Sequence, residues 1–176
     1  SNTISNCILY NSTHGVYLDA SSNNNISKCI IYKNIHGILL VSDSAGNTII
    51  NCTSYNNTWG IYLYYSSNNK IYHNNFINNT NQSYDSSFNY WDDGYPSGGN
   101  YWSDYNGSDE DGDGIGDTPY NILGGNNQDH CPFMRQNGWV EVSEFIPRKP
   151  IYINGNNDFT LENGVTSGSG TESDPY

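Results

Sequence analysis

The chain has 176 residues and carries six Lys and Arg against eighteen Asp and Glu, which gives a formal net charge of -12. This charge argues against nucleic acid and against an anionic membrane surface as partners, because both recruit basic patches. It suits a divalent cation and an extracellular location, and no apolar stretch reaches the length of a membrane span. Asn, Ser, Thr, Gly and Tyr dominate the composition, which predicts short strands and many turns.

A repeat of 22–23 residues starts at Asn2 and returns at Asn24, Asn47 and Asn69. Its apolar positions alternate as in a half-buried strand. One repeat cannot bury its own apolar face, so repeats must stack, with equivalent residues about 4.8 Å apart and asparagines bonded as amide ladders. The repeat therefore predicts an all-β, parallel β-helix. The main columns are Ile4, Ile26, Ile49 and Ile71; Cys7, Cys29 and Cys52; Tyr10, Tyr32 and Tyr55; and Gly15, Gly37 and Gly60.

The coils "NTISNCILYNSTHGVYL", from Asn2, and "NNISKCIIYKNIHGILL", from Asn24, resemble those of a known superfamily. This is the carbohydrate-binding and sugar-hydrolase β-helix superfamily, which includes the periplasmic accessory protein of nitrous oxide reductase. The segment from Trp91 to Met134 is similar to the region that closes such β-helices in archaeal secreted proteins. The resemblance covers essentially the whole chain. It implies a right-handed parallel β-helix at the cell surface, and it implies no single activity.

The segment Ser108–Asp117, "SDEDGDGIGD", carries the ligand spacing of an EF-hand calcium loop. Counted from Asp109, oxygen ligands fall at positions 1, 3, 5, 7 and 9, and a glycine at position 6 permits the sharp turn. Position 12 is Tyr120 instead of the EF-hand glutamate, so we expect Asp104 or Asp129 to supply missing ligands. The loop resembles those of thrombospondin type 3 repeats and dockerins. The expected ligands are Asp109, Asp111, Asp113, the carbonyl oxygen of Ile115, and Asp117.

Oxygen ligands in a flexible, glycine-rich loop favour Ca²⁺ over Mg²⁺. We expect the ion to be structural, because residues 91–134 contain little that could form a core, yet they must cover the open end of the β-helix. Trp91 and Trp102 are expected to plug that end. A second ion at Asp92 or Asp93 is one alternative, and a solvated acidic loop without metal is another.

The sequence predicts four segments. These are coils over 1–90, a calcium-binding cap over 91–134, an extended linker over 135–150, and a segment over 151–176 that resembles the start of a further β-helix unit. The last segment either belongs to a tandem array or adds strands to the first coil of a neighbouring copy, which would give a head-to-tail filament. Expected partners are therefore other copies or adjoining β-helix units. The residues expected at that contact are Ile151, Tyr152, Ile153 and Phe159.

The coils offer no convincing catalytic constellation. Acidic residues are nearly absent from them, and His14 and His36 stand in a column that continues with Trp59, which indicates a repeat position. Copper would need a cluster of His, Met and Cys, whereas the cysteine column is expected to be a buried row of thiols. We therefore expect an extracellular structural or adhesive protein and no enzymatic activity. The alternative is a module that binds or degrades polysaccharide, such as a cell-surface glycan, through Trp59, Tyr62, Tyr64 and Tyr65.

Overall fold

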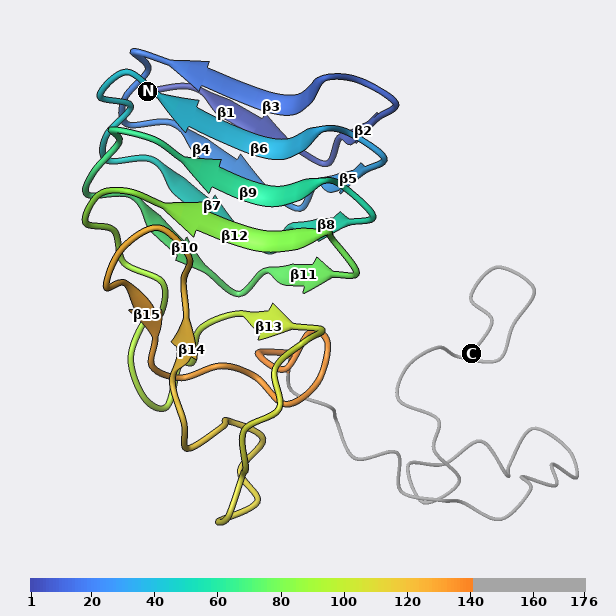
Figure 1. The fold of residues 1–176 in the computed structure, drawn as a ribbon, viewed down its shortest axis with the longest axis vertical. Coiled ribbons are helices and arrows are strands. Elements are labelled where there is room, and N and C mark those ends of the chain that lie inside the picture. The colour runs from blue at the N-terminus through green and yellow to red at the C-terminus, as the bar shows by residue number, and fades with distance from the viewer. Residues whose placement is uncertain (141–176) are drawn as a thin grey trace, which may run out of the picture. The chain divides into compact units, whose positions relative to one another are not determined.

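The computed structural model describes residues 1–140, and they form the predicted parallel β-helix (Figure 1). Each coil contributes three short strands, and equivalent strands of successive coils pair in parallel, so that three sheets run along the molecule. The first sheet consists of β1 (Thr3–Ser5), β4 (Asn25–Ser27), β7 (Thr48–Ile50) and β10 (Lys70–Tyr72). The second consists of β2 (Ile8–Tyr10), β5 (Ile30–Tyr32), β8 (Thr53–Tyr55), β11 (Asn75–Ile77) and β13 (Tyr101–Trp102). The third consists of β3 (His14–Asp19), β6 (His36–Val41), β9 (Trp59–Leu63) and β12 (Asn81–Asp85).

The pairing register confirms that one sequence repeat is one coil. Thr3 pairs with Asn25, Asn25 with Thr48, and Thr48 with Lys70, which are steps of 22, 23 and 22 residues. Most inward columns keep an aliphatic residue, so aliphatic side chains stack on aliphatic side chains inside the coils and exclude water, although Ser54 stands between Ile31 and Phe76 in one column. The fully buried part of this core is Ile26, Ile31, Ile38, Leu40, Ile49, Ile61, Leu63, Ile71 and Phe76.

The corners between strands need a left-handed backbone at fixed positions. Asn6, Lys28, Asn51 and His73 occupy the same corner of successive coils, with φ of 55° or 56°. Asparagine is among the few residues other than glycine that adopt this conformation at low cost, which accounts for part of its abundance. The next corner repeats the pattern at Asn11, Lys33, Asn56 and Asn78.

A second class of asparagine forms ladders with a fixed direction. The backbone N–H and side-chain amide of Asn24 donate to Oδ1 of Asn47 at 2.8 and 3.1 Å, and Asn47 donates in the same way to Asn69 at 2.9 and 3.0 Å. Asn69 donates in turn to Asn89. Each member therefore points its donors toward the C-terminal end, and the last member needs an acceptor beyond the ladder. A parallel ladder runs through Asn34, Asn57 and Asn79.

Buried aspartates end two of the ladders. Asp85, fully buried, accepts the Asn89 side-chain amide at 2.9 Å and the indole N–H of Trp91 at 3.0 Å. Asp129, also fully buried, follows Asn74 and Asn100 in another ladder and accepts the Asn100 backbone N–H at 2.7 Å. An ionised carboxylate has acceptors and no donor, so it closes a row of donors without a clash.

The cap continues from the fourth coil. Trp91 and Trp102 are each about 1 % exposed, and the Trp102 ring stacks on Phe76 at 4.6 Å, directly below the coil core. The two tryptophans thus lie where the core would otherwise meet water. A short antiparallel hairpin of β14 (Tyr120–Asn121) and β15 (Gln128–Asp129) lies beside them, and Tyr120 stacks on Trp102 at 4.3 Å.

The glycine column gives a test of how tightly the coils stack. A Cβ on Gly37 would lie 2.5 Å from the carbonyl oxygen of Gly60 and 2.5 Å from Oγ of Ser54. Gly37→Ala is therefore expected to lower the free energy of unfolding by about 3 kcal/mol. Gly94, whose Cβ would meet nothing within 4 Å, has φ of 74°, so Gly94→Ala is expected to cost only about 1 kcal/mol of strain. Urea unfolding of both variants measures the difference between their free energies of unfolding. Equal decreases for the two variants would show that the coils can move apart to accommodate a methyl group at this column.

Candidate metal centre

The acidic loop brings three of the predicted ligands together. One carboxylate oxygen from each of Asp109, Asp111 and Asp113 lies within 4.8 Å of the others. The same side chains fold the loop, since Asp109 accepts the backbone N–H groups of Gly112 at 2.8 Å and Gly114 at 3.0 Å. Three like charges this close repel one another, and a divalent cation between them would remove that repulsion.

The loop is anchored to the cap on one side. Ile115 forms an antiparallel bridge with Phe133, and the N–H of Gly116 donates to the carbonyl of Pro132 at 2.7 Å. The N–H of Ile115 points the other way, to Asp113 at 2.8 Å. Because the N–H and C=O of an extended residue point to the same edge, the Ile115 carbonyl is turned away from Phe133, toward the side on which Asp113 lies.

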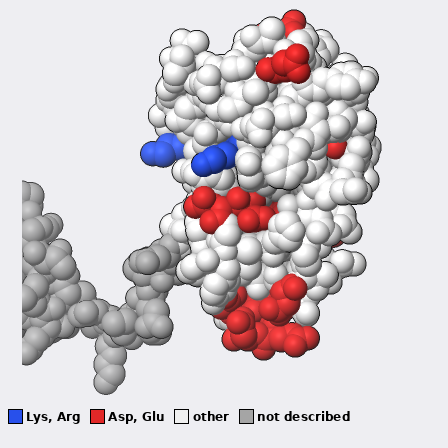
Figure 2. Space-filling view, turned by 90° about the vertical axis from the view of Figure 1, so that its left-hand side faces the viewer, with Lys and Arg blue, Asp and Glu red and all other residues white. Residues whose placement is uncertain are grey.

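The other candidate ligands lie outside this cluster. Asp117 is held at the neck of the loop, where its carboxylate accepts the N–H of Glu110 at 2.7 Å. Asp104 accepts the hydroxyl of Tyr120 at 3.2 and 3.3 Å. Asp92 pairs with His130 at 3.0 Å. Acidic side chains gather at the lower end of the molecule, where this loop lies (Figure 2).

Asp129 has a different environment from the one expected of a metal ligand. Its oxygens accept N–H groups of Asn100, Trp102 and Cys131 at 2.7, 2.9 and 3.1 Å. Burial raises the pKa of Asp129 to about 7, and these N–H donors oppose the rise. The structure therefore places Asp129 in the polar core of the cap. The sequence signal that points to such a role is the paired "Asn-Tyr-Trp" at 89–91 and 100–102, because each buried indole N–H needs an acceptor.

Of the predicted sugar-stacking residues, some have rings packed against other aromatic side chains and others have rings exposed to solvent. Tyr62 stacks on Tyr84 at 4.4 Å and meets the edge of Trp59 at 5.1 Å, so its ring is part of an aromatic row on the third sheet. Tyr64 and Tyr65 are 41 % and 62 % exposed and touch each other edge-on at 4.3 Å. Of the four residues, these two offer the most open surface.

The column of cysteines is reduced and hydrogen-bonded to the backbone. The thiols of Cys7, Cys29 and Cys52 point at carbonyl oxygens two residues earlier in the chain, at 3.3, 3.3 and 3.4 Å. A hydrogen bond with the Cys29 thiol, together with burial, raises the pKa of Cys52. The thiols thus occupy the place that the side-chain amide of Asn74 takes in the next coil, where it donates to Tyr72.

Comparison with known proteins supports the fold. Within residues 1–140, the structure contains no helix long and apolar enough to cross a membrane. No curated protein and no solved structure matches the chain. A family model described as "NosD: Periplasmic copper-binding protein (NosD)" matches residues 1–107, which include all four coils and both buried tryptophans of the cap. This match spans more than half of the 176 residues, and the chain therefore belongs to the NosD family of β-helix proteins.

Proposed function

We propose that the chain is an extracellular structural or adhesive β-helix that joins other copies, or adjoining β-helix units, end to end, and that calcium at the acidic loop stabilises it. The observation that carries the proposal is the edge of the first coil. Strands β1, β2 and β3 each stand at the end of a sheet, so one edge of each has no strand partner among the described residues. Three such edges on one coil match the strands of another coil of the same period.

The asparagine ladders leave hydrogen-bond acceptors at this edge, so a coil that docks there must supply the donors. Backbone N–H groups of the first coil already donate downward, from Asn2 to Asn24 and from Ser12 to Asn34, each at 3.0 Å. A coil that stacks above would donate to Asn2 in the same way, through its own N–H groups. The predicted occupant is the segment 151–176, with Ile151, Tyr152, Ile153 and Phe159, which lies outside the described residues. Such a contact joins two different surfaces and need not close.

Calcium is supported by the chemistry of the loop. The three carboxylates, with the Ile115 carbonyl turned to the side of Asp113, offer an all-oxygen set, which selects a hard cation, and the glycine-rich backbone suits the flexible geometry of Ca²⁺. Ile115 is the one buried apolar residue of Ser108–Asp117, so packing alone contributes little to the order of this segment.

Light scattering behind a sizing column tests assembly. The full chain in calcium is expected to form long polymers that shrink on addition of a chelator. A chain truncated after residue 150 is expected to remain monomeric in both conditions, because it lacks the segment that would dock. A full chain that is monomeric with and without calcium would contradict end-to-end self-assembly and favour a unit of a tandem protein.

Copper, named in the family description, does not fit the described residues well. Within residues 1–140, the only group of three or more His, Cys, Asp or Glu ligands within 4.8 Å of one another is the aspartate cluster, whose oxygens are poor copper ligands. The rings of His14 and His36 lie 5.1 Å apart and are tilted by 44°, and the Nδ1 atoms of both are buried without a hydrogen-bond partner, but these residues add no third donor. We therefore assign no copper role to this chain.

Polysaccharide binding is the second candidate, supported by the exposed rings of Tyr64 and Tyr65. Incubation with neutral and acidic glycans, followed by assays for binding and cleavage, separates this candidate from a purely structural role. We expect no turnover. Cleavage that is lost on mutation of a coil residue would overturn the structural proposal.

A further inference from the structure

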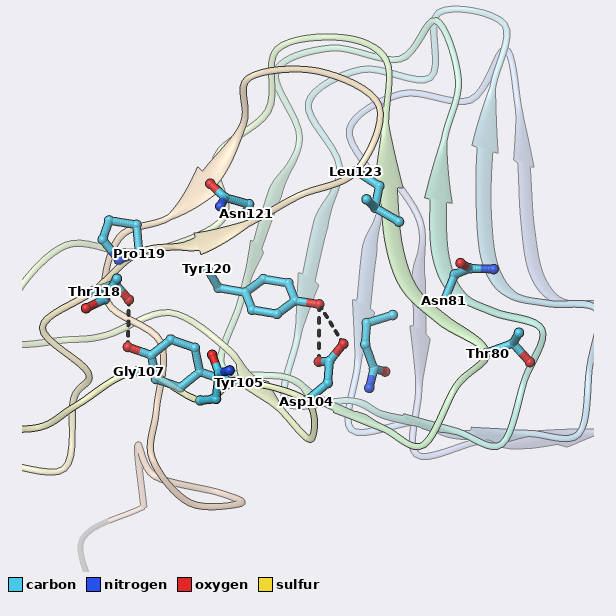
Figure 3. A pocket seen from close by; sticks show the side chains of 12 residues that line it. Thr80, Asn81, Asp104, Tyr105, Gly107, Thr118, Pro119, Tyr120, Asn121 and Leu123 are labelled. Carbon is cyan, nitrogen blue, oxygen red and sulfur yellow. Dashed lines mark hydrogen bonds between the residues drawn. The ribbon is translucent and has the colours of Figure 1, made fainter.

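The cap and the fourth coil enclose a cleft of about 410 Å³ (Figure 3). One wall comes from Thr80, Asn81 and Gln82 at the start of β12. The opposite walls come from residues 104–107, which follow β13, and from residues around β14. The volume is in the range of small-molecule sites in proteins. The predicted sugar-stacking residues and the aspartates of the acidic loop do not line this cleft, whereas Asp104, which the sequence offered as a further calcium ligand, does.

Two tyrosine rings form a fixed corner in the cleft. One face of Tyr120 is covered by Trp102, at 4.3 Å and nearly parallel, and Tyr120 lines the cleft. Tyr105 meets Tyr120 at 6.5 Å with an angle of 64° between the rings. The hydroxyl of Tyr105 donates to the carbonyl of Thr118 at 2.6 Å, and a Cβ on Gly107 would lie 2.1 Å from that hydroxyl oxygen. The corner is therefore held by packing and hydrogen bonding before any ligand arrives.

The cleft is negatively charged. Asp104 is exposed, and its carboxylate accepts the Tyr120 hydroxyl at its edge, as Figure 3 shows. None of the described residues that line the cleft is Lys or Arg. Burial and then the charge of Asp104 raise the pKa of Tyr120. Burial also raises the pKa of Tyr105, against its hydrogen bond to Thr118, and the charges of Asp117, Asp129 and Asp109 add to the rise.

We propose that this cleft binds a ligand through an alkylammonium group. The cation lies against the ring faces of Tyr105 and Tyr120, where the negative face of an aromatic ring attracts it, and its charge is balanced by Asp104. The amides of Asn81 and Asn121 lie in the same cleft and can hydrogen-bond the rest of the ligand. Phosphates and uronates are disfavoured, because no basic side chain is present to pair with them. This binding does not depend on the proposed assembly.

Titration calorimetry with the full chain tests the class of ligand. Choline is the probe, and its uncharged carbon analogue 3,3-dimethyl-1-butanol is the matched control. Choline is expected to bind with a Kd on the order of 1–10 mM, and the alcohol at least about tenfold more weakly. The alkylammonium group could belong to a quaternary amine or to a lysine side chain, and Nα-acetyl-lysine methylamide is the probe for the second source. Tighter binding of either this compound or choline, relative to the uncharged alcohol, supports the proposed site.

Variants locate the site. Asp104→Asn is expected to weaken choline binding about tenfold, because it removes the charge and keeps the shape. Asp19→Asn is the matched control, since Asp19 is also exposed and also accepts a tyrosine hydroxyl, that of Tyr17 at 3.3 Å. It should leave binding unchanged. The proposal is overturned if the alcohol binds as well as choline, if Asp104→Asn has no effect, or if neutral oligosaccharides bind more tightly than either amine.

Discussion

Asp129→Ala is expected to lower the free energy of unfolding by about 4 kcal/mol. The substitution removes the acceptor of four N–H groups, two from Asn100 and one each from Trp102 and Cys131, at a site with no exposed surface. Each buried N–H left without a partner costs about 1–3 kcal/mol, and water that enters the space offsets part of the loss. Urea unfolding at pH 7, followed by tryptophan fluorescence, measures the change close to the mutated site.

Two further variants make this result specific. Asp129→Asn keeps one oxygen for Asn100 and Trp102 and turns an amide toward the Cys131 N–H, so we expect a loss of only about 1–2 kcal/mol. Asp19→Ala removes an exposed carboxylate and should change stability by less than about 0.5 kcal/mol. If Asp129→Ala were as stable as Asp19→Ala, the aspartate would not be the partner on which the end of the ladder depends.

Calcium is expected to stabilise the protein by about 2.7 kcal/mol when its concentration is one hundred times its Kd, provided that it binds only the folded chain. For a chain of this size, that corresponds to a rise in Tm of roughly 5–10 °C. The double variant Asp111→Asn, Asp113→Asn should lose this rise. Its stability without calcium should equal or exceed that of the parent, because two of the three mutually repelling charges are gone. Differential scanning calorimetry with calcium and with chelator measures both effects.

The selectivity for the metal gives a second readout. Magnesium demands near-ideal octahedral geometry and dehydrates reluctantly, so at equal concentration it should raise Tm much less than calcium does. Asp19→Asn, which changes the net charge outside the loop, should keep the full calcium effect. Identical melting of the parent protein in calcium and in chelator would rule out the loop as a stabilising metal site.

The coils could be predicted from the sequence because every coil of a solenoid places equivalent residues in the same environment. Each column of the repeat meets the same neighbours, so one residue type recurs at a fixed interval, and the spacing of Asn24, Asn47 and Asn69 gave the pairing register directly. The three clustered aspartates were also visible, because their ligand spacing is local in the chain. The sequence did not separate asparagines of the corners from those of the ladders, since both classes recur with the same period.

The cap could not be predicted at this level because its contacts follow no period. The ladder that ends at Asp129 continues past the coils in steps of 26 and 29 residues, so no fixed interval points to its last member. The expectation that Asp104 or Asp129 would supply the missing calcium ligands rested on residue type, without any signal for where the two side chains lie. In the structure one accepts a tyrosine hydroxyl in the cleft and the other lies in the core of the cap.

The one-way asparagine ladders have a consequence for how such chains change in length. A duplicated coil brings one new asparagine to each of the ladders that run through Asn47 and Asn57, and each newcomer accepts from the coil above and donates to the coil below, as Asn47 does. Gene duplication can therefore lengthen or shorten the molecule by whole turns while the acceptors at its far end stay as they are. The length of a single turn is less restricted, since the steps from Asn24 to Asn47, Asn47 to Asn69 and Asn69 to Asn89 are 23, 22 and 20 residues, so the ladder fixes how turns stack and lets the corners vary in length.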